Sequence, residues 1–234
     1  MIYCAYMYSI YFVRHGESQA NQQKIYAGTL DSPLTSTGRL QAHETAHILK
    51  DMQIKHIITS GLSRASDTAL IIKNIIDPQN VITMESKEFL NEIYFGDIQG
   101  KPYGDISGLE YAISSKTGES LDELYERGLQ AVAHLKTIAK DGNILVVGHG
   151  TFSAIIFALI ENINKEDFIE YRKNFKFHNG EIKKLPCNYF IFPNNLLYSH
   201  VCKQLINTST YLPMDPHLAI QAQADTEHCS SLNN

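Results

Sequence analysis

The sequence contains few cysteines, and their positions exclude the common folds that depend on them. The four cysteines are Cys4, Cys187, Cys202 and Cys229, and no two of them form a Cys-x-x-Cys pair. Scattered thiols of this kind are not typical of a disulfide framework or a zinc knuckle. We therefore expect neither, and we predict that the protein works in the reducing cytoplasm.

Long apolar runs and an excess of basic residues are also missing. No apolar stretch reaches the length of about 18 residues that a membrane-spanning helix needs. Residues 1–13 lack a basic region, which favours a strand with a short lead-in over a signal peptide; Met1 or Met7 could be the start. The net charge of −5 argues against a general nucleic-acid or membrane-surface binder, although local arginines could hold a small anionic substrate.

The remaining composition is that of an ordinary globular protein. The 234 residues are 44% hydrophobic and 19% charged, which is enough to bury one sizeable core. From residue 207 onward there is no lysine or arginine and little periodicity. We predict one domain over residues 1–206, as a monomer or a homodimer, and a mobile tail over residues 207–234.

Short apolar runs rich in β-branched and aromatic residues alternate with helical patterns along the chain. The predicted strands cover residues 10–13, 56–59, 81–84 and 144–147, and the predicted helices cover residues 35–52, 63–76, 120–140 and 153–160. The glycine-rich stretch over residues 89–120 is predicted to be irregular. This alternation predicts an α/β fold, a three-layer α/β/α sandwich around a largely parallel central sheet.

Two histidines follow two of the predicted strands directly. Arg14-His15-Gly16 ends the first strand, and Gly148-His149-Gly150 ends the run Ile144–Val147. Ligands of parallel sheets bind beyond the carboxyl ends of the strands, so both histidines are expected to face one crevice. An arginine there suits phosphate, because guanidinium binds phosphate oxygens in a planar fork. The alternative is a pair of ordinary strand ends with surface side chains.

A competing motif lies in the first long helix. His43-Glu44-Thr45-Ala46-His47 matches His-Glu-x-x-His, which on a helix can supply two zinc ligands and a glutamate base. Both histidines lie one step off the predicted core stripe of Ala42, Ala46 and Leu49, as exposed residues do. No convincing third ligand follows, so we predict a covering helix and no metal site.

Six sequence blocks, taken in order, resemble the histidine phosphatase superfamily, the phosphoglycerate-mutase-like enzymes, over residues 7–193. They are Val13-Arg14-His15-Gly16-Glu17 with Asn21; Pro33-Leu34-Thr35 with Gly38 and Gln41-Ala42; Ser60 with Leu62-Ser63-Arg64-Ala65 and Thr68-Ala69; Leu90-Asn91-Glu92 with Gly96 and Gln99-Gly100; Gly118-Glu119-Ser120; and Val146-Val147-Gly148-His149-Gly150.

The resemblance implies a phosphate pocket and a role for each matching residue. His15 would be the nucleophile that becomes a phosphohistidine, and Glu92 would be the proton donor and acceptor. Arg14, Arg64 and His149 would bind the phosphoryl oxygens and stabilise the transition state. The implied substrate-binding set adds the three positions Asn21, Gly28 and Gly150. No metal or other cofactor is implied.

The branch of the superfamily is predicted from what surrounds Glu92. The cofactor-dependent phosphoglycerate mutases of this family have a longer insertion between the acid and the second histidine, an Arg and a His directly after the acid, and an adjacent arginine pair in the insertion. This chain has Ile93-Tyr94 after Glu92 and no Arg-Arg pair. We therefore predict a metal-independent phosphomonoesterase for small phosphorylated metabolites, with a cofactor-dependent phosphoglycerate mutase or a phospho-ligand-binding module as alternatives. Four aromatic residues, Tyr94, Phe95, Tyr103 and Tyr111, are candidates for a leaving-group pocket or for plain packing.

Overall fold

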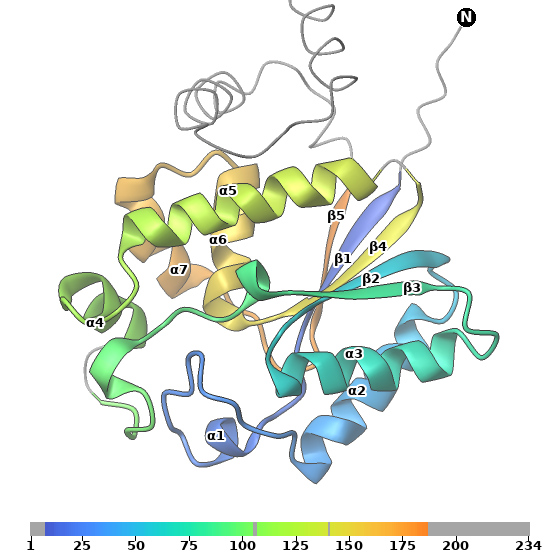
Figure 1. Ribbon diagram of the computed structural model, residues 1–234, viewed down its shortest axis with the longest axis horizontal. Helices are drawn as coiled ribbons and strands as arrows, with labels where there is room; N and C mark the ends of the chain where they lie inside the picture. The colour runs from blue at the N-terminus through green and yellow to red at the C-terminus, as the bar shows by residue number, and fades with distance from the viewer. Residues whose placement is uncertain (1–7, 105–106, 140, 187–234) are drawn as a thin grey trace, which may run out of the picture. The chain divides into compact units, whose positions relative to one another are not determined.

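The apolar runs of the sequence form one central sheet (Figure 1). The computed structural model describes residues 8–104, 107–139 and 141–186. Within them the sheet has the order β3-β2-β4-β1-β5. Its strands are β1 (Ser9–Arg14), β2 (Ile54–Ser60), β3 (Thr83–Lys87), β4 (Asn143–Gly148) and β5 (Ile182–Pro186). The first four run parallel and β5 pairs with β1 in antiparallel direction, so the predicted largely parallel sheet is confirmed.

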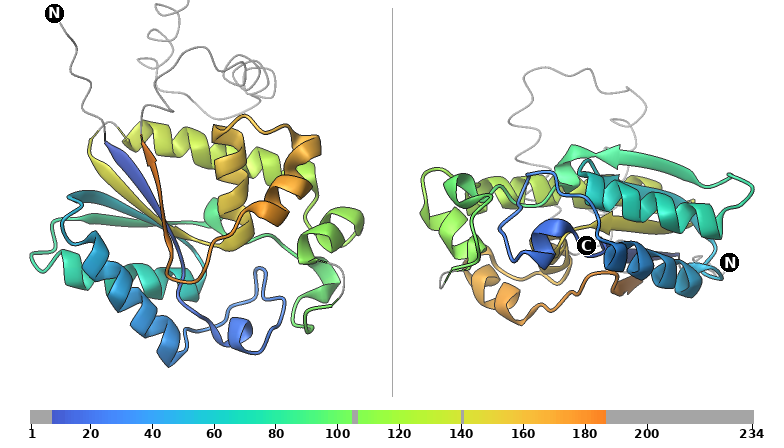
Figure 2. Two further views of the ribbon diagram at one scale, coloured as in Figure 1. Left: turned by 180° about the vertical axis from the view of Figure 1, so that it is seen from behind. Right: turned by 90° about the horizontal axis from the view of Figure 1, so that it is seen from below.

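Helices cover both faces of this sheet, as the predicted three-layer sandwich requires (Figure 2). Side chains alternate along β1. Tyr11 and Val13 pack in a core cluster with residues of α2 (Ser36–Leu49) and α3 (Ser63–Ile76). Phe12 points the other way and meets the ring of Phe157 in α6 (Gly150–Ile160). On that side α5 (Leu121–Ile138) packs against α6. The next helix in the chain, α7 (Phe168–Asn174), also contacts α6.

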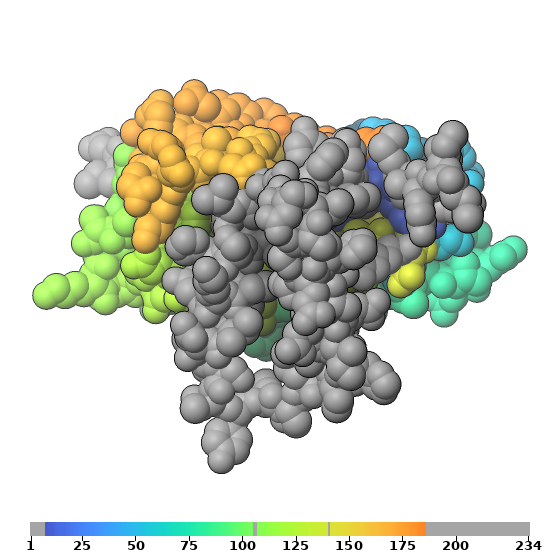
Figure 3. Space-filling model, turned by 90° about the horizontal axis from the view of Figure 1, so that it is seen from above, coloured from blue at the N-terminus to red at the C-terminus, as the bar shows by residue number. Residues whose placement is uncertain are grey.

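Shorter helices lie in the connections. They are α1 (Gln19–Gln22), α4 (Gly108–Ser114) and the 3₁₀ turns Glu88–Leu90, Gly96–Ile98 and Lys165–Asp167. The region of α4 and the connection from α3 to β3 lie on opposite sides of the described domain (Figure 3). No helix among the described residues is long and apolar enough to cross a membrane.

Capping residues set the helix starts where the sequence predicted them. Thr35 accepts a hydrogen bond from the backbone N–H of Gly38 and begins α2. Ser120 and Glu123 form the predicted capping box at the start of α5. The helix predicted over residues 153–160 begins earlier: α6 starts at Gly150, directly after its N-cap residue His149.

One strand was predicted too early, and its shift has a local cause. The strand expected at residues 81–84 lies at Thr83–Lys87. Both oxygens of Asp77 accept hydrogen bonds from the backbone N–H groups of Val81 and Ile82, at 2.8 and 2.7 Å. These two residues are therefore held in the turn after α3 and are not free to pair with β2.

The sequence pattern did not reveal every short element, and several predictions concern residues outside the described ranges. The pattern missed α4, α7 and β5, which are each seven residues or shorter. The start at Met1 or Met7, the tail over residues 207–234 and all four cysteines lie outside the described residues. The boundaries predicted for them stay predictions.

Candidate active site

The sheet register brings the two strand-end histidines together. Arg14 of β1 lies opposite Gly148 of β4, and the backbone N–H of His15 donates to the carbonyl of Gly148 at 2.9 Å. The ring centroids of His15 and His149 are 5.1 Å apart. Both rings are buried. Parallel pairing of these strands, which lie far apart in the sequence, therefore builds the centre of the site.

His15 has a defined orientation and a defined charge. Its Nδ1 lies 2.7 Å from the carbonyl oxygen of Gly16, so Nδ1 carries the proton and Nε2 keeps its lone pair. The Nε of Arg64 donates to that Nε2 at 3.3 Å. Burial, together with Arg64 and Arg14, holds the pKa of His15 well below its ordinary value. The ring is therefore neutral at pH 7, and Nε2 is available as a nucleophile.

Arg64 is one of the largest fully buried side chains of the described residues, and backbone carbonyls fix it. Its guanidinium donates to the carbonyl of Leu30 at 2.9 Å and to that of Gly28 at 2.6 Å. Gly28 has a φ of +53°, and a Cβ there would lie 2.1 Å from an oxygen of Gln99. The loop before α2 therefore needs glycine at this point to hold the arginine. Burial lowers the pKa of Arg64, which remains charged.

Two asparagines order the loop beside His15. The Oδ1 of Asn21 accepts hydrogen bonds from the backbone N–H of Ser18 at 3.1 Å and from Nδ2 of Asn179 at 3.3 Å. Asn179 also donates to the carbonyl of His15 at 2.8 Å. Because its Oδ1 is occupied in this way, Asn21 can present its amide N–H to the pocket.

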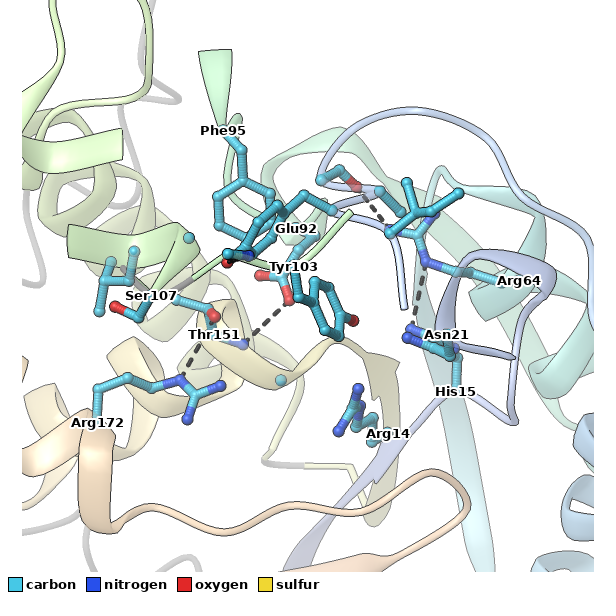
Figure 4. A pocket seen from close by; sticks show the side chains of 18 of the residues that line it. Arg14, His15, Asn21, Arg64, Glu92, Phe95, Tyr103, Ser107, Thr151 and Arg172 are labelled. Atoms are coloured by element: carbon cyan, nitrogen blue, oxygen red, sulfur yellow. Dashed lines mark hydrogen bonds between the residues drawn. The ribbon is translucent and has the colours of Figure 1, made fainter. Parts of the chain in front are cut away.

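The carboxylate of Glu92, which follows the 3₁₀ turn Glu88–Leu90 in the chain, contacts the N-terminus of α6. Its carboxylate accepts hydrogen bonds from the backbone N–H groups of Thr151 at 3.1 Å and Phe152 at 2.9 Å. The free N–H groups of a helix N-terminus attract a negative charge, so this position holds the carboxylate in place. Glu92 thus points into the same cavity as Arg14 and Arg64 (Figure 4).

The segment that carries Glu92 is clamped from α5. Arg127 donates to the carbonyls of Asn91 at 2.6 Å and Phe89 at 3.1 Å. It also forms a two-point ion pair with Glu119, with N–O distances of 2.7 and 2.8 Å. Glu119 in turn accepts the backbone N–H of Tyr94 at 3.2 Å. The backbone on both sides of Glu92 is therefore held by one charged pair.

Two buried polar atoms beside the histidines are left without a hydrogen-bond partner in the described residues. They are Nε of Arg14 and Nδ1 of His149. Ser60 Oγ donates to Asn91 at 2.9 Å, so it accepts from Nε2 of His149 at 2.7 Å. Arg14 Nε is a donor, and His149 Nδ1 becomes one when the ring takes up a proton. The unpaired Nε of Arg14 therefore suits an oxygen of a bound anion, whereas Nδ1 of a neutral His149 ring keeps a lone pair and can donate only after protonation.

These groups surround a cavity of about 410 Å³. Seven of the eight sequence-predicted site residues line it, namely Arg14, His15, Asn21, Gly28, Arg64, Glu92 and Gly150. His149, the eighth, is fully buried and does not line the cavity. Its ring packs edge-on against the ring of His15, which does. Of the four candidate aromatic residues only Phe95 and Tyr103 line the cavity, whereas the Tyr111 hydroxyl donates to Asp97 at 2.7 Å.

Sequence reasoning missed Arg172, which lines the cavity from α7. Its Nε lies 3.4 Å from the hydroxyl of Thr151, and one terminal nitrogen donates to the carbonyl of Phe175 at 3.3 Å. Burial lowers the pKa of Arg172, and the charge of Glu92 opposes that shift. The one signal that could have found it is the basic pair Arg172-Lys173 at the end of a short amphipathic stretch.

The His-Glu-x-x-His motif takes no part in this site. His43 and His47 are exposed on the outer face of α2, while Ala42, Ala46 and Leu49 form its buried stripe as predicted. No group of three potential metal ligands occurs within the part of the chain that the structure describes. The motif is therefore part of a covering helix.

Comparison with known proteins agrees with this arrangement. A family model described as the histidine phosphatase superfamily (branch 1) matches residues 10–188. The chain is 34% identical to the probable phosphoglycerate mutase GpmB of Photorhabdus laumondii, over 62% of this chain and 70% of that protein. It is 33% identical to the uncharacterized phosphatase PhoE of Bacillus subtilis, over 69% and 80%. The structure of the alpha-ribazole phosphatase from Shigella flexneri superposes with a TM-score of 0.64 at 25% identity, over 75% and 89%.

Proposed function

Because the chain belongs to the histidine phosphatase superfamily, we propose that it is a phosphomonoesterase that hydrolyses small phosphorylated metabolites through a phosphohistidine at His15. The observation that carries the proposal is the state of His15. A neutral ring presents its Nε2 lone pair to a cavity in which Arg14 and Arg64 supply positive charge. The scattered cysteines favour a cytoplasmic enzyme.

The residues around His15 allow a two-step reaction. In the first step Nε2 bonds to phosphorus, the ester P–O bond breaks, and a protonated Glu92 gives its proton to the leaving alcohol. In the second step Glu92 takes a proton from water, the hydroxide oxygen bonds to phosphorus, and the P–N bond breaks. Arg14 and Arg64 hold the phosphoryl charge throughout. Phosphate leaves, and the enzyme returns to its starting state.

We further propose that no metal ion is required. In many phosphoryl-transfer enzymes a metal ion neutralises the charge that develops on the phosphoryl oxygens. Here the two arginines already lie at that place, and Arg64 is fixed by backbone carbonyls. Dialysis against a chelator should leave turnover of p-nitrophenyl phosphate unchanged. A loss of activity that added metal restores would contradict this part of the proposal.

The test of the reaction itself uses p-nitrophenyl phosphate and two histidine variants. His15→Ala should lower turnover by at least about 10³-fold, because no other described group is placed to accept the phosphoryl group. His43→Ala removes an exposed histidine of the unused motif and should behave as the wild type. Acid quenching of the wild-type reaction should trap an acid-labile phosphoenzyme. Retained turnover in His15→Ala would overturn the mechanism.

Two alternatives give different results in the same set of assays. A phosphoglycerate mutase, as the Photorhabdus laumondii relative is named, would interconvert 2- and 3-phosphoglycerate in the presence of a bisphosphate activator. Brisk interconversion with slow release of phosphate would favour that function. A binding module would hydrolyse no aryl phosphate at any pH but would still bind phosphate esters.

A further inference from the structure

The cavity holds more positive charge than a phosphate group needs. Its described lining includes three guanidinium groups, those of Arg14, Arg64 and Arg172, but only one acidic side chain, Glu92. None of the three guanidiniums forms a salt bridge within the described residues. The lining lysine, Lys173, differs, since its ammonium lies 3.3 Å from Glu110 and 3.9 Å from Glu170.

The charge balance during the reaction leaves one arginine over. A phosphate monoester brings close to two negative charges at pH 7, which match Arg14 and Arg64. Glu92 must carry a proton to serve as the acid, so in that step it contributes no negative charge. Glu92 is the negative charge that acts on Arg172, so a neutral Glu92 leaves this partly buried cation without that charge, and an anionic group of a ligand would replace it.

The position of Arg172 indicates which part of a substrate it faces. It lies beyond Arg14 as seen from His15 (Figure 4). A Cβ on Gly150 would lie 3.6 Å from its Nη2 and 3.7 Å from Cζ of Arg14, so the two guanidiniums flank this glycine. Its Nε contacts Thr151, whose backbone N–H donates to Glu92. Arg172 is therefore next to the proton donor, on the side where the leaving alcohol must sit.

We propose that Arg172 is a specificity-determining residue that binds an anionic group on the leaving alcohol, so that the preferred substrates are phosphomonoesters with a second negative charge. This inference rests on the proposed function and names its substrate class. A carboxylate or a second phosphate can each accept two parallel hydrogen bonds from a guanidinium. The hydrogen bonds to Thr151 and Phe175 hold the guanidinium ready for either.

The test compares substrates that differ only in that charge. The carboxylate arm pairs 3-phosphoglycerate with glycerol 3-phosphate, and the phosphate arm pairs fructose 1,6-bisphosphate with fructose 1-phosphate. Wild-type kcat/KM should favour the more anionic member of at least one pair by about 10- to 100-fold, the range expected of a hydrogen bond between charged groups. The arm that shows the preference identifies the anion. Arg172→Met should reduce that ratio to near one.

The control and a binding measurement separate the possible failures. Arg39→Met removes an exposed arginine of α2, which lies 3.7 Å from Asp67, and should keep the wild-type ratio. No preference in either pair, or an unchanged ratio in Arg172→Met, would overturn the subsite. Calorimetry on His15→Ala with the same four compounds measures their binding affinities without turnover. If the wild type hydrolyses no ester but this variant binds the more anionic compound more tightly, the proposed function fails and the subsite stands.

Discussion

The two histidines of the candidate site are both buried, but their ring nitrogens have different surroundings. His15 donates a hydrogen bond from its Nδ1–H to the backbone carbonyl of Gly16, and its Nε2 accepts one from Nε of Arg64. His149 uses Nε2 for Ser60 and leaves Nδ1 without a partner among the described residues. The Nε2 lone pair of His15 thus lies beside the fixed cation Arg64 at the cavity, whereas His149 is not among the residues that line the cavity. His149 is suited to hydrogen bonding with an oxygen when the ring is protonated.

Glu92 gives the sharpest prediction for a single residue. Glu92→Gln cannot donate the proton that a poor leaving group needs, so kcat/KM for alkyl phosphates should fall by about 10²- to 10⁴-fold. The loss for p-nitrophenyl phosphate should be much smaller, since nitrophenolate leaves without a proton. Steady-state kinetics with both substrates, and thermal unfolding to check that the variant folds, measure this. Equal losses for the two substrates would argue against Glu92 as the acid.

The site residues that could be predicted from the sequence lie in local motifs, whereas those that could not are placed only by tertiary contacts. Arg14, His15 and His149 stand in short motifs at the ends of predicted strands, so their neighbourhood could be inferred, whereas Glu92 lies in a stretch predicted to be irregular and was indicated only by the family resemblance. Asn179 contacts the carbonyl of His15 from 164 positions away, in a stretch with no motif. Only the tertiary fold places Asn179 and Arg172 at the site, and no local pattern predicts such contacts.

At the scale of elements, α5 controls where Glu92 points. Arg127 and Glu119 hold the backbone on both sides of this residue through three hydrogen bonds, and an ion pair joins the two side chains. Arg127 also lies 4.0 Å above the ring centroid of Phe152, whose backbone N–H donates to Glu92. The helix, the acid and the start of α6 therefore form one unit.

Arg127→Lys should loosen that unit without removing a reacting group. A lysine cannot span two carbonyls and a carboxylate, and a shift of the acid by about 1 Å can cost up to about 100-fold in rate. We expect kcat for alkyl phosphates to fall by about 10- to 100-fold with a smaller change in KM. Aryl phosphates should be affected less, which a purely structural loss of active protein would not produce. Glu126→Gln, an exposed change on the same helix, serves as the matched control.

The fold was predictable from the sequence where an element carried its own boundary signals. Thr35, Ser120 and Asp77 mark ends of long helices, and the apolar run after Asn143 marks the central strand. The antiparallel strand β5 has two lysines in five residues and lies at the sheet edge, so its pattern is weak. Its position depends on pairing with β1, which sequence periodicity does not report.

For the whole molecule, the two buried histidines make stability depend on pH. Burial holds the pKa of both well below the ordinary value, so the folded protein keeps them neutral where the unfolded chain protonates them. Stability should therefore fall as the pH drops below about 6.5, by about 1 kcal/mol per pH unit for each histidine, until the folded-state pKa is reached. Urea unfolding at pH 7.5 and 5.5 measures the difference.

His15→Asn provides the reference for that measurement. This variant removes one of the two buried bases, so its stability should depend less steeply on pH between these values. Carboxylates contribute equally to both proteins and cancel in the comparison. A slope identical to that of the wild type would show that His15 is protonated in the folded state.

The central place of β4 in the sheet governs when the candidate site can be completed during synthesis of the chain. β1 and β2 do not pair with each other, because β4 lies between them and pairs with both. A growing chain that ends before Asn143 therefore lacks the strand that pairs with both β1, before His15, and β2, before Arg64. Chains emerge from the ribosome N-terminus first, and such non-local pairings form slowly. We therefore expect a nascent chain to complete the candidate site only after β4 has left the ribosome and paired with both strands.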